Sequence, residues 1–178
     1  MQVKGTKIIK IRRTIRLGMT LVITLYVREG IVMASDSRLT FSATIQEQER
    51  QIVQMAVAES DSNYKTFLTS NNVGISAYGA GDIQGVPIGG LIESFINEKL
   101  AQGSYPVEEV AQELLKYFQS FPKPPEVGFL VAGYKRVDSV AEQHVWEVLV
   151  SQNRVERLNQ PSVPGAAWRG ETDVMRRL

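Results

Sequence analysis

The chain has 178 residues, of which 43% are hydrophobic and 22% are charged, a balance typical of one soluble globular domain. It contains no cysteine and a single histidine, which excludes disulfides and a thiol nucleophile and argues against a His/Cys metal site. We therefore expect no metal and no cofactor, and we expect a cytoplasmic protein, because nothing in the composition indicates an oxidising compartment. His144 lies in a strand-like pattern and is expected to be structural.

Charge is unevenly distributed along the chain. Residues 1–19 carry six basic and no acidic side chains, so the remainder has a net charge of −5 within a total of +1. A mildly acidic body argues against nucleic acid as a partner. No apolar run approaches the roughly 18 residues of a membrane span, so we also expect no membrane contact.

The basic leader, residues 1–19, lacks the apolar segment of a secretory signal. It is a propeptide removed on maturation, an untranslated upstream extension with Met19 as the true start, or a basic arm that stays attached. Met19 directly before Thr20 favours the second alternative, because cellular methionine removal acts before small residues. Residues 20–178 then form one domain.

The first structured segment is a predicted hairpin. Residues 20–27 are rich in β-branched side chains and predict a buried strand, followed by a turn at 28–30 and a return strand at 31–36. Because a hairpin brings the start of its first strand beside the end of its second, this arrangement places Thr20 near Asp36.

A long loop and a second hairpin are predicted next. Residues 42–64 are rich in Gln and Glu and predict a loop with a helical turn at 52–57. Residues 65–69 and 73–77 predict two strands around Asn71-Asn72, since asparagine tolerates the left-handed conformations of a tight turn.

Two helices and two strands complete the predicted elements. Asp82 is expected to cap a helix whose apolar face runs from Val86 to Leu100, and a second helix is expected after Ser104. Strands are predicted at 127–134 and 144–150, a loop at 161–165, and the start of a helix at 173–178. Strands, then helices, then strands favour an α+β fold over a doubly wound parallel sheet.

Thr20, Asp36 and Lys65 form the candidate catalytic group. A threonine hydroxyl needs a neighbouring base to become a nucleophile, and the free α-amine of the same residue can be that base. The hypothesis is therefore that the mature chain begins at Thr20. The Lys65 ammonium would lower the cost of negative charge on the hydroxyl oxygen, and Asp36 would hold Lys65 by a charge-assisted hydrogen bond.

The segments at 20–23 and 30–40 resemble the amino terminus of mature proteasome β-type subunits and their bacterial relatives. The sixteen positions from Thr20 to Asp36 match the spacing in that family between the nucleophile and its acidic partner. Lys65 resembles the lysine that precedes the family's third strand.

The resemblance continues beyond Lys65 and covers roughly residues 20–178. Gly79 falls at the family's substrate-facing glycine, fourteen positions after Lys65, and the sequence Gly-Asp-Ile-Gln from Gly81 resembles the Gly-Asp-Ala-Gln that opens its first helix. The resemblance implies an α+β fold, the four-layer αββα sandwich of N-terminal nucleophile (Ntn) hydrolases.

The same resemblance implies a threonine-type endopeptidase of a proteasome-like assembly. Thr20, Asp36 and Lys65 would be catalytic, the Gly79 N–H would serve the oxyanion, and Thr40, Gly79 and Gly81 would bind substrate. A polypeptide substrate would add as a strand along Thr40 and Gly79. The implied partners are that substrate, other copies or related subunits in a ring, and an ATP-dependent unfoldase.

Two departures from the family pattern leave alternatives open. The stretch from Thr40 to Lys65 is longer than usual. Residues 168–173 stand where the family has a small loop facing the nucleophile, and a helix, strands and an Asp and Ser that orient the site would follow residue 178. We therefore expect a truncated or divergent member. The alternatives are a catalytically inactive structural ring subunit and a small-molecule amidohydrolase of the Ntn class.

Overall fold

The computed structural model describes residues 16–17, 20–37, 39–47, 50–60, 64–101 and 103–170, and of 16–17, 39–47 and 50–60 it describes the backbone alone. No helix within this part of the chain combines the length and the apolar character needed to cross a membrane.

An antiparallel five-stranded sheet forms the centre of the molecule. Its strands are β6 (Thr66–Leu68), β7 (Gly74–Gly79), β10 (Val127–Val137), β11 (Val140–Leu149) and β12 (Arg154–Arg157). Their order across the sheet is β12-β11-β10-β7-β6. The turn η2 (Val150–Gln152) joins β11 to β12.

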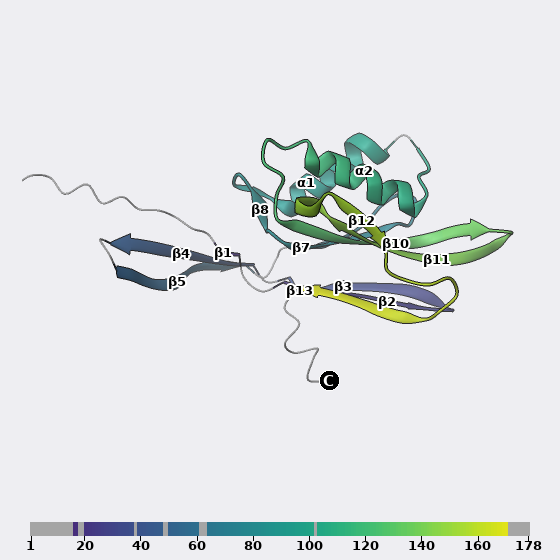
Figure 1. Ribbon diagram of the computed structural model, residues 1–178, viewed down its shortest axis with the longest axis horizontal. Coiled ribbons are helices and arrows are strands. Elements are labelled where there is room, and N and C mark those ends of the chain that lie inside the picture. The colour runs from purple at the N-terminus through teal and green to yellow at the C-terminus, as the bar shows by residue number, and fades with distance from the viewer. Residues whose placement is uncertain are drawn as a thin grey trace, which may run out of the picture.

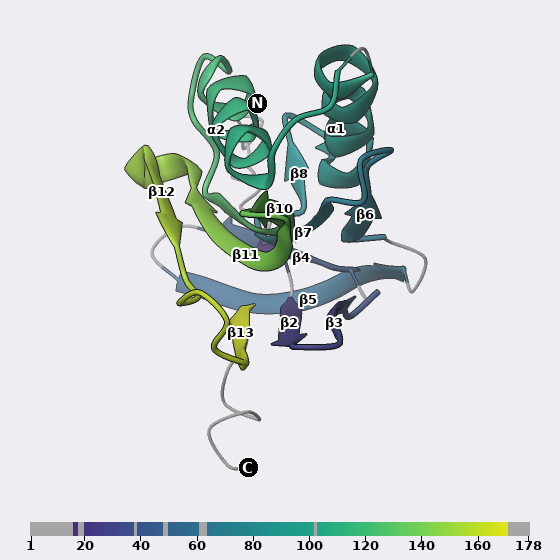
Figure 2. The same ribbon diagram turned by 90° about the vertical axis from the view of Figure 1, so that its right-hand side faces the viewer.

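Helices cover one face of the central sheet and a second sheet covers the other (Figures 1 and 2). The helices are α1 (Ile88–Phe95), its π-helical continuation η1 (Ile96–Leu100), and α2 (Val107–Gln119). The second sheet contains β2 (Leu21–Val27), β3 (Gly30–Ser35) and β13 (Gly165–Gly170) in the order β13-β2-β3.

Two smaller sheets lie outside these layers. The strands β1 (Arg16–Leu17), β4 (Leu39–Glu47) and β5 (Arg50–Ser60) form a ribbon in the order β1-β4-β5, which projects from the body in Figure 1. The strands β8 (Asp82–Ile83) and β9 (Val86–Pro87) form a short hairpin immediately before α1.

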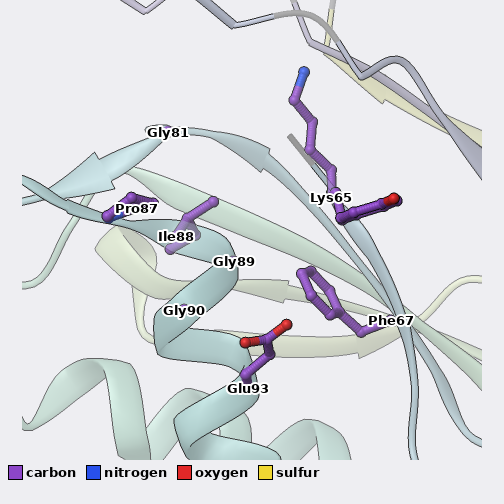
Figure 3. Close-up of a pocket in the computed structure, with 9 residues that line it drawn as sticks. Lys65, Phe67, Gly81, Pro87, Ile88, Gly89, Gly90 and Glu93 are labelled. Atoms are coloured by element: carbon purple, nitrogen blue, oxygen red, sulfur yellow. The ribbon is translucent and has the colours of Figure 1, made fainter. Parts of the chain in front are cut away.

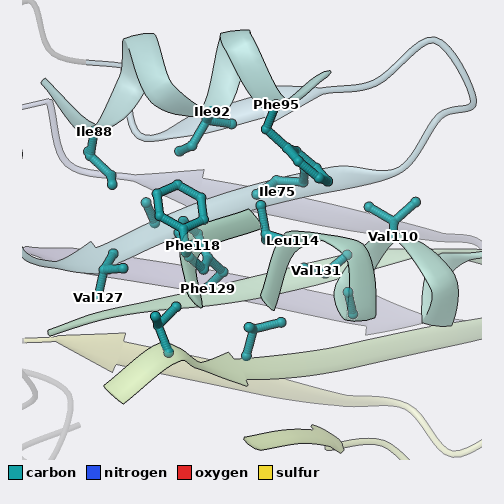
Figure 4. Close-up of a cluster of buried hydrophobic side chains, with 14 of the residues drawn as sticks. Ile75, Ile88, Ile92, Phe95, Val110, Leu114, Phe118, Val127, Phe129 and Val131 are labelled. Carbon is teal, nitrogen blue, oxygen red and sulfur yellow. The ribbon is translucent and has the colours of Figure 1, made fainter. Parts of the chain in front are cut away.

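The main core lies between the helices and the central sheet (Figure 4). The buried stripe of α2 recurs every three or four residues, as the sequence predicts, and its members are Val107, Val110, Ala111, Leu114 and Phe118. Phe118 packs on Phe129 of β10 with ring centroids 4.8 Å apart. Burying a side chain of this size contributes about 1.5–3 kcal/mol, so this interface anchors the helices on the sheet.

A second cluster fills the space between the two sheets and includes Val22, Tyr26, Leu130, Val145 and Ala167. Alternate residues of β2 point to opposite faces, so its buried residues face the central sheet and the others face outward. The outward side chains of Leu25, Val27, Val32 and Trp168 are 38–62% exposed. The second sheet therefore presents an apolar outer face in the described residues.

Several predicted elements are confirmed. The strands β2 and β3 pair as the expected hairpin, and β6 and β7 pair around a turn in which Asn72 has a φ of 57°. The helix α2 begins directly after Pro106, and β10 pairs with β11 along its length.

Other predictions are wrong. The expected loop and helical turn in residues 42–64 are replaced by β4 and β5, because the apolar residues between the Gln and Glu positions suit a strand pair. Asp82 caps no helix: its carboxylate accepts a hydrogen bond from Gly85 N at 3.0 Å in the β8–β9 turn, and α1 starts six residues later.

Two strands of the two main sheets were not predicted. The strand β12 extends the central sheet, and β13 replaces part of the stretch expected as a loop at 168–173, because β2 offers it a free edge. The helix expected at 173–178 lies outside the described residues.

The described residues thus form three layers: helices, central sheet and second sheet. This mostly β arrangement agrees with the expected α+β class and with three layers of the expected four-layer sandwich. A second helical layer is not among the residues that the structure describes.

Candidate active site

Asp36 and Lys65 form an ion pair where the two sheets meet. Asp36 directly follows β3 and Lys65 directly precedes β6. Lys65 Nζ donates to Asp36 Oδ1 at 2.9 Å, and Lys65 is only 5% exposed, whereas the Asp36 side chain is 30% exposed. The Lys65 carbonyl oxygen accepts a hydrogen bond from Ala77 N at 2.8 Å, which fixes this end of β6 beside β7.

The same carboxylate holds the backbone next to Thr20. Leu21 N donates to Asp36 Oδ1 at 2.9 Å, and Asp36 N donates to the Leu21 carbonyl oxygen at 3.0 Å. The Lys65 ammonium and the amide that follows Thr20 therefore share one oxygen atom, and no more than two hydrogen-bond lengths separate them. Thr20 itself is half-buried.

Gly170 supports the Thr20 backbone from the opposite side. It is the last residue of β13, it pairs with Leu21, and its φ is +97°. A Cβ on Gly170 would overlap the Thr20 carbonyl oxygen and lie 2.6 Å from its carbonyl carbon. Sequence reasoning missed this residue as a member of the site. The available signal was the glycine inside the stretch that the resemblance places opposite the nucleophile.

Three hydroxyl groups, two of them on residues adjacent in sequence to the ion pair, form a hydrogen-bonded cluster. Thr66 Oγ1 lies 3.0 Å from Ser35 Oγ and 2.8 Å from Ser76 Oγ, within hydrogen-bonding distance of both. Ser35 precedes Asp36, and Thr66 follows Lys65. The three hydroxyls therefore tie β3 to β6 and β7 and fix the two strands that carry the ion pair. No pattern in the sequence indicated this arrangement.

Gly79 ends β7 with a φ of +91°. A Cβ at this position would lie 2.6 Å from the Glu126 carbonyl oxygen, so a larger residue would collide with the backbone that leads into β10. Ala80 N donates to the same oxygen at 3.0 Å. The close approach of two backbones explains why glycine occupies this position.

Thr40 lies in β4, where it pairs with Glu59. Its side chain lies outside what the structure describes, so its part in substrate binding stays a prediction.

A cavity of about 170 Å³ opens beside Lys65 and the start of α1. Gly81 borders it, and its other lining residues include Phe67, Ile88 and Glu93. Figure 3 shows the Lys65 amine pointing away from α1, while the Lys65 backbone borders the cavity. The cavity is mainly apolar and has one carboxylate at its wall.

The structure thus joins Asp36 to Lys65, brings both to the backbone beside Thr20, and places Gly81 and Lys65 on one cavity. These contacts form a compact polar site at one end of the sheet sandwich. A buried ammonium that shares a carboxylate oxygen with the amide following a threonine can stabilise negative charge in its neighbourhood.

No protein-family model matches the sequence, and no curated protein matches it. Among solved structures, the fold is similar to that of the Anbu (Gly-1) mutant from Hyphomicrobium sp. strain MC1, with a TM-score of 0.52 and 15% sequence identity. The match covers 89% of this chain and 64% of that one, so the chain spans less than two thirds of its neighbour. At this identity the likeness concerns the fold alone.

Proposed function

We propose that the chain is a threonine-type peptidase subunit of a proteasome-like assembly, with Thr20 as its N-terminal nucleophile. The observation that carries this proposal is the buried Lys65 ammonium on Asp36 Oδ1, the same oxygen that binds the amide following Thr20. A buried cation at this point would stabilise the negative charge that forms when the neighbouring hydroxyl loses its proton.

The reaction begins with a free α-amine on Thr20, exposed by removal of a propeptide or of Met19. An α-amine has an ordinary pKa of about 7.7–8.0, so a fraction of it is neutral near pH 7 and accepts the hydroxyl proton. The hydroxyl oxygen attacks a peptide carbonyl, and Lys65 stabilises the charge that develops. The proton then passes to the leaving amine, an acyl ester remains on Thr20, and water hydrolyses that ester.

Gly79 is the proposed oxyanion donor and strand-pairing residue, together with Thr40 and Gly81. An extended polypeptide would add to the backbone at these positions as a further strand. The cavity beside Gly81 would hold one substrate side chain. Its walls of Phe67 and Ile88 favour an apolar side chain of moderate size.

The assembly is part of the proposal. Residues 1–19 are absent from the active form, and residues 20–178 belong to an Ntn-hydrolase domain whose second helical layer covers the apolar outer face of the second sheet. Copies or related subunits form a ring, and an ATP-dependent unfoldase supplies unfolded substrate. An exposed apolar sheet face supports this arrangement, since such faces are normally covered.

The decisive experiment combines mass spectrometry with one substitution. The active protein should begin at Thr20, and Thr20→Ala should abolish hydrolysis of fluorogenic peptides and labelling by a threonine-directed covalent inhibitor. Thr20→Ser, which keeps a hydroxyl, should retain part of the activity. The control is Thr24→Val on the same strand, because the buried Thr24 hydroxyl has no hydrogen-bond partner among the described residues.

Each alternative function gives a different result. Activity with the leader intact, or retained in Thr20→Ala, would rule out this nucleophile. A ring without turnover or labelling indicates a structural subunit, and hydrolysis of simple amides but not peptides indicates an amidohydrolase.

A further inference from the structure

A buried carboxylate outside the proposed catalytic pair connects the two sheets. Glu147 lies on β11, and its side chain is only 4% exposed. Tyr78 of β7 donates its hydroxyl to Glu147 Oε1 at 2.5 Å. Arg169 of β13 donates through Nε to Oε1 and through Nη2 to Oε2 at 2.9 Å. One carboxylate therefore binds residues of both sheets at once.

Each of its two partners directly precedes a glycine of the candidate site. Tyr78 is followed by Gly79, the proposed oxyanion donor, and Arg169 is followed by Gly170, which contacts the Thr20 carbonyl. Glu147 thereby holds two backbone segments that belong to different sheets and that each lead into one of these glycines.

A third glycine, Gly128, leaves room for the Tyr78 ring to extend to Glu147. The strand β10 lies between β7 and β11, and Tyr78 pairs with Gly128 on it. A Cβ on Gly128 would overlap the Tyr78 ring. The ring therefore crosses β10 over Gly128 to reach Glu147 on the far strand. The glycine at position 128 leaves the space for this crossing.

The electrostatics favour a charged network. Burial opposes ionisation of Glu147, but the hydrogen bonds from Arg169 and Tyr78 outweigh it and lower the Glu147 pKa. The hydrogen bond to Glu147 raises the pKa of Arg169, and burial together with that carboxylate raises the pKa of Tyr78. Glu147 is thus a carboxylate and Tyr78 a neutral donor near neutral pH.

Stability alone is a weak reason to keep such a network. Replacing a buried ion pair by apolar side chains is often neutral or stabilising, and the surrounding inter-sheet space is already filled by apolar residues. What the network supplies, and an apolar cluster does not, is a directional link between Tyr78 and Arg169.

We propose that Glu147 is a positioning residue of this hydrolase, which holds Gly79 and Gly170 in fixed register on either side of Thr20 through Tyr78 and Arg169. This inference rests on the proposed function. Glu147 touches no reacting atom, so its contribution is to the geometry of the oxyanion donor and of the nucleophile's backbone.

The test compares Glu147→Gln and Tyr78→Phe with Val145→Ala. Val145 lies on the same strand and faces the same inter-sheet space, but its side chain is apolar, so its truncation loosens the packing without touching the network. Glu147→Gln should lower kcat about tenfold or more with KM changed less than twofold, because misplacing reacting groups slows chemistry rather than binding. Rates are normalised to sites titrated with the covalent inhibitor.

A second readout does not require activity. Hydrogen exchange measured by mass spectrometry should increase in Glu147→Gln both in the peptide that contains Gly79 and in the peptide that contains Gly170. In Val145→Ala, exchange in these two peptides should increase no more than in the rest of the protein. Tyr78→Phe should increase it at Gly79 alone. If Glu147→Gln does not fold, Tyr78→Phe tests the same inference. Its kcat should be reduced, and its hydrogen exchange should increase only in the peptide that contains Gly79.

The outcomes separate this inference from the proposed function. If Thr20→Ala is inactive while folded Glu147→Gln keeps the wild-type kcat or matches Val145→Ala, the positioning role is overturned and the nucleophile stands. If Thr20→Ala stays active, the proposed nucleophile is wrong, and the exchange at Gly79 and Gly170 still decides whether Glu147 couples them. Unchanged exchange at both glycines overturns the coupling.

Discussion

The Lys65 ammonium lies 2.9 Å from the Asp36 carboxylate across the junction of two sheets, although the residues are 29 positions apart in the chain. Lys65 is buried and Asp36 is partly open, so the pair is neither a solvated surface bridge nor a fully enclosed one. Such a pair keeps the cation out of solvent while its counter-charge stays partly open to solvent.

Loss of the Lys65 charge should abolish turnover. We expect Lys65→Ala to reduce kcat by about 10²-fold or more, the size of effect seen when one charge-stabilising donor is removed. Lys116→Ala is the matched control, because Lys116 forms an exposed pair with Glu113 at 2.7 Å and surface pairs contribute little. Equal peptide hydrolysis by wild type and Lys65→Ala would contradict the role.

Substitution of Gly170 should disturb Thr20. Gly170→Ala combines a positive φ with a collision on the Thr20 carbonyl, whereas Gly85→Ala has a φ of +84° with nothing within 4 Å. Backbone strain alone costs about 1–2 kcal/mol, so we expect Gly85→Ala to lose that much stability and Gly170→Ala to lose more. Urea denaturation measures both, and only Gly170→Ala should also lose inhibitor labelling.

The hydroxyl groups behind the ion pair should matter for both stability and rate. Thr66→Val leaves the buried Ser76 hydroxyl without this partner, which should cost about 1–3 kcal/mol of unfolding free energy and lower kcat. Thr69→Val is the control: its hydroxyl accepts a hydrogen bond from Val73 N in the adjacent turn, so this variant should lose stability without a change in kcat. A kcat reduced equally in both variants would argue against the role of Thr66.

Two neighbouring glycines of α1 should respond differently to alanine. A Cβ on Gly90 meets nothing within 4 Å, so Gly90→Ala should add about 0.5–1 kcal/mol of stability by reducing the entropy of the unfolded chain. A Cβ on Gly89 would lie 3.2 Å from the Phe67 ring and 3.3 Å from the Tyr64 carbonyl oxygen, so Gly89→Ala should gain less or lose stability. Thermal unfolding distinguishes them, and equal gains would contradict the close packing of α1 on β6.

The single histidine offers a pH test of the fold. Burial, followed by the nearby Arg157 and Lys135 charges, lowers the His144 pKa below its ordinary 6.5, although Glu142 with Oε1 2.9 Å away opposes the shift. A depressed pKa means that the unfolded chain binds this proton more tightly, so stability falls as pH decreases below 6.5. NMR titration of this one imidazole should give a value below 6.5, and lower still in Glu142→Gln. A value at or above 6.5 would be inconsistent with this burial.

Local patterns predicted those elements whose structure is local. The alternation in residues 20–36, the Asn71-Asn72 turn and the spacing of the α2 stripe each depend on neighbours in the chain, and each is confirmed. The strands β4 and β5 were missed because their polar residues resemble a loop until each strand is seen to supply the other with backbone partners.

The candidate site shows the same difference between features that the local sequence indicates and contacts that are distant in the chain. The hairpin geometry and the resemblance singled out Thr20, Asp36 and Lys65, and the last two do pair. Glu147 could not be found from the sequence, because its partners lie on elements distant in the chain and it lies in no distinctive motif. Gly170 was missed although the resemblance places its stretch opposite the nucleophile, because its contact with Thr20 depends on the long-range pairing of β13 with β2. Long-range contacts of this kind become visible only in three dimensions.

The pairing of Leu21 with Gly170 joins nearly opposite ends of the described chain. Contacts so far apart in sequence form late, because a long loop must close before they are made. During synthesis, one edge of β2 therefore stays unpaired until β13 has left the ribosome. Under the proposed function, a nascent chain shorter than this has the Thr20 nucleophile without the β13 backbone that supports it, and so is not yet an active peptidase.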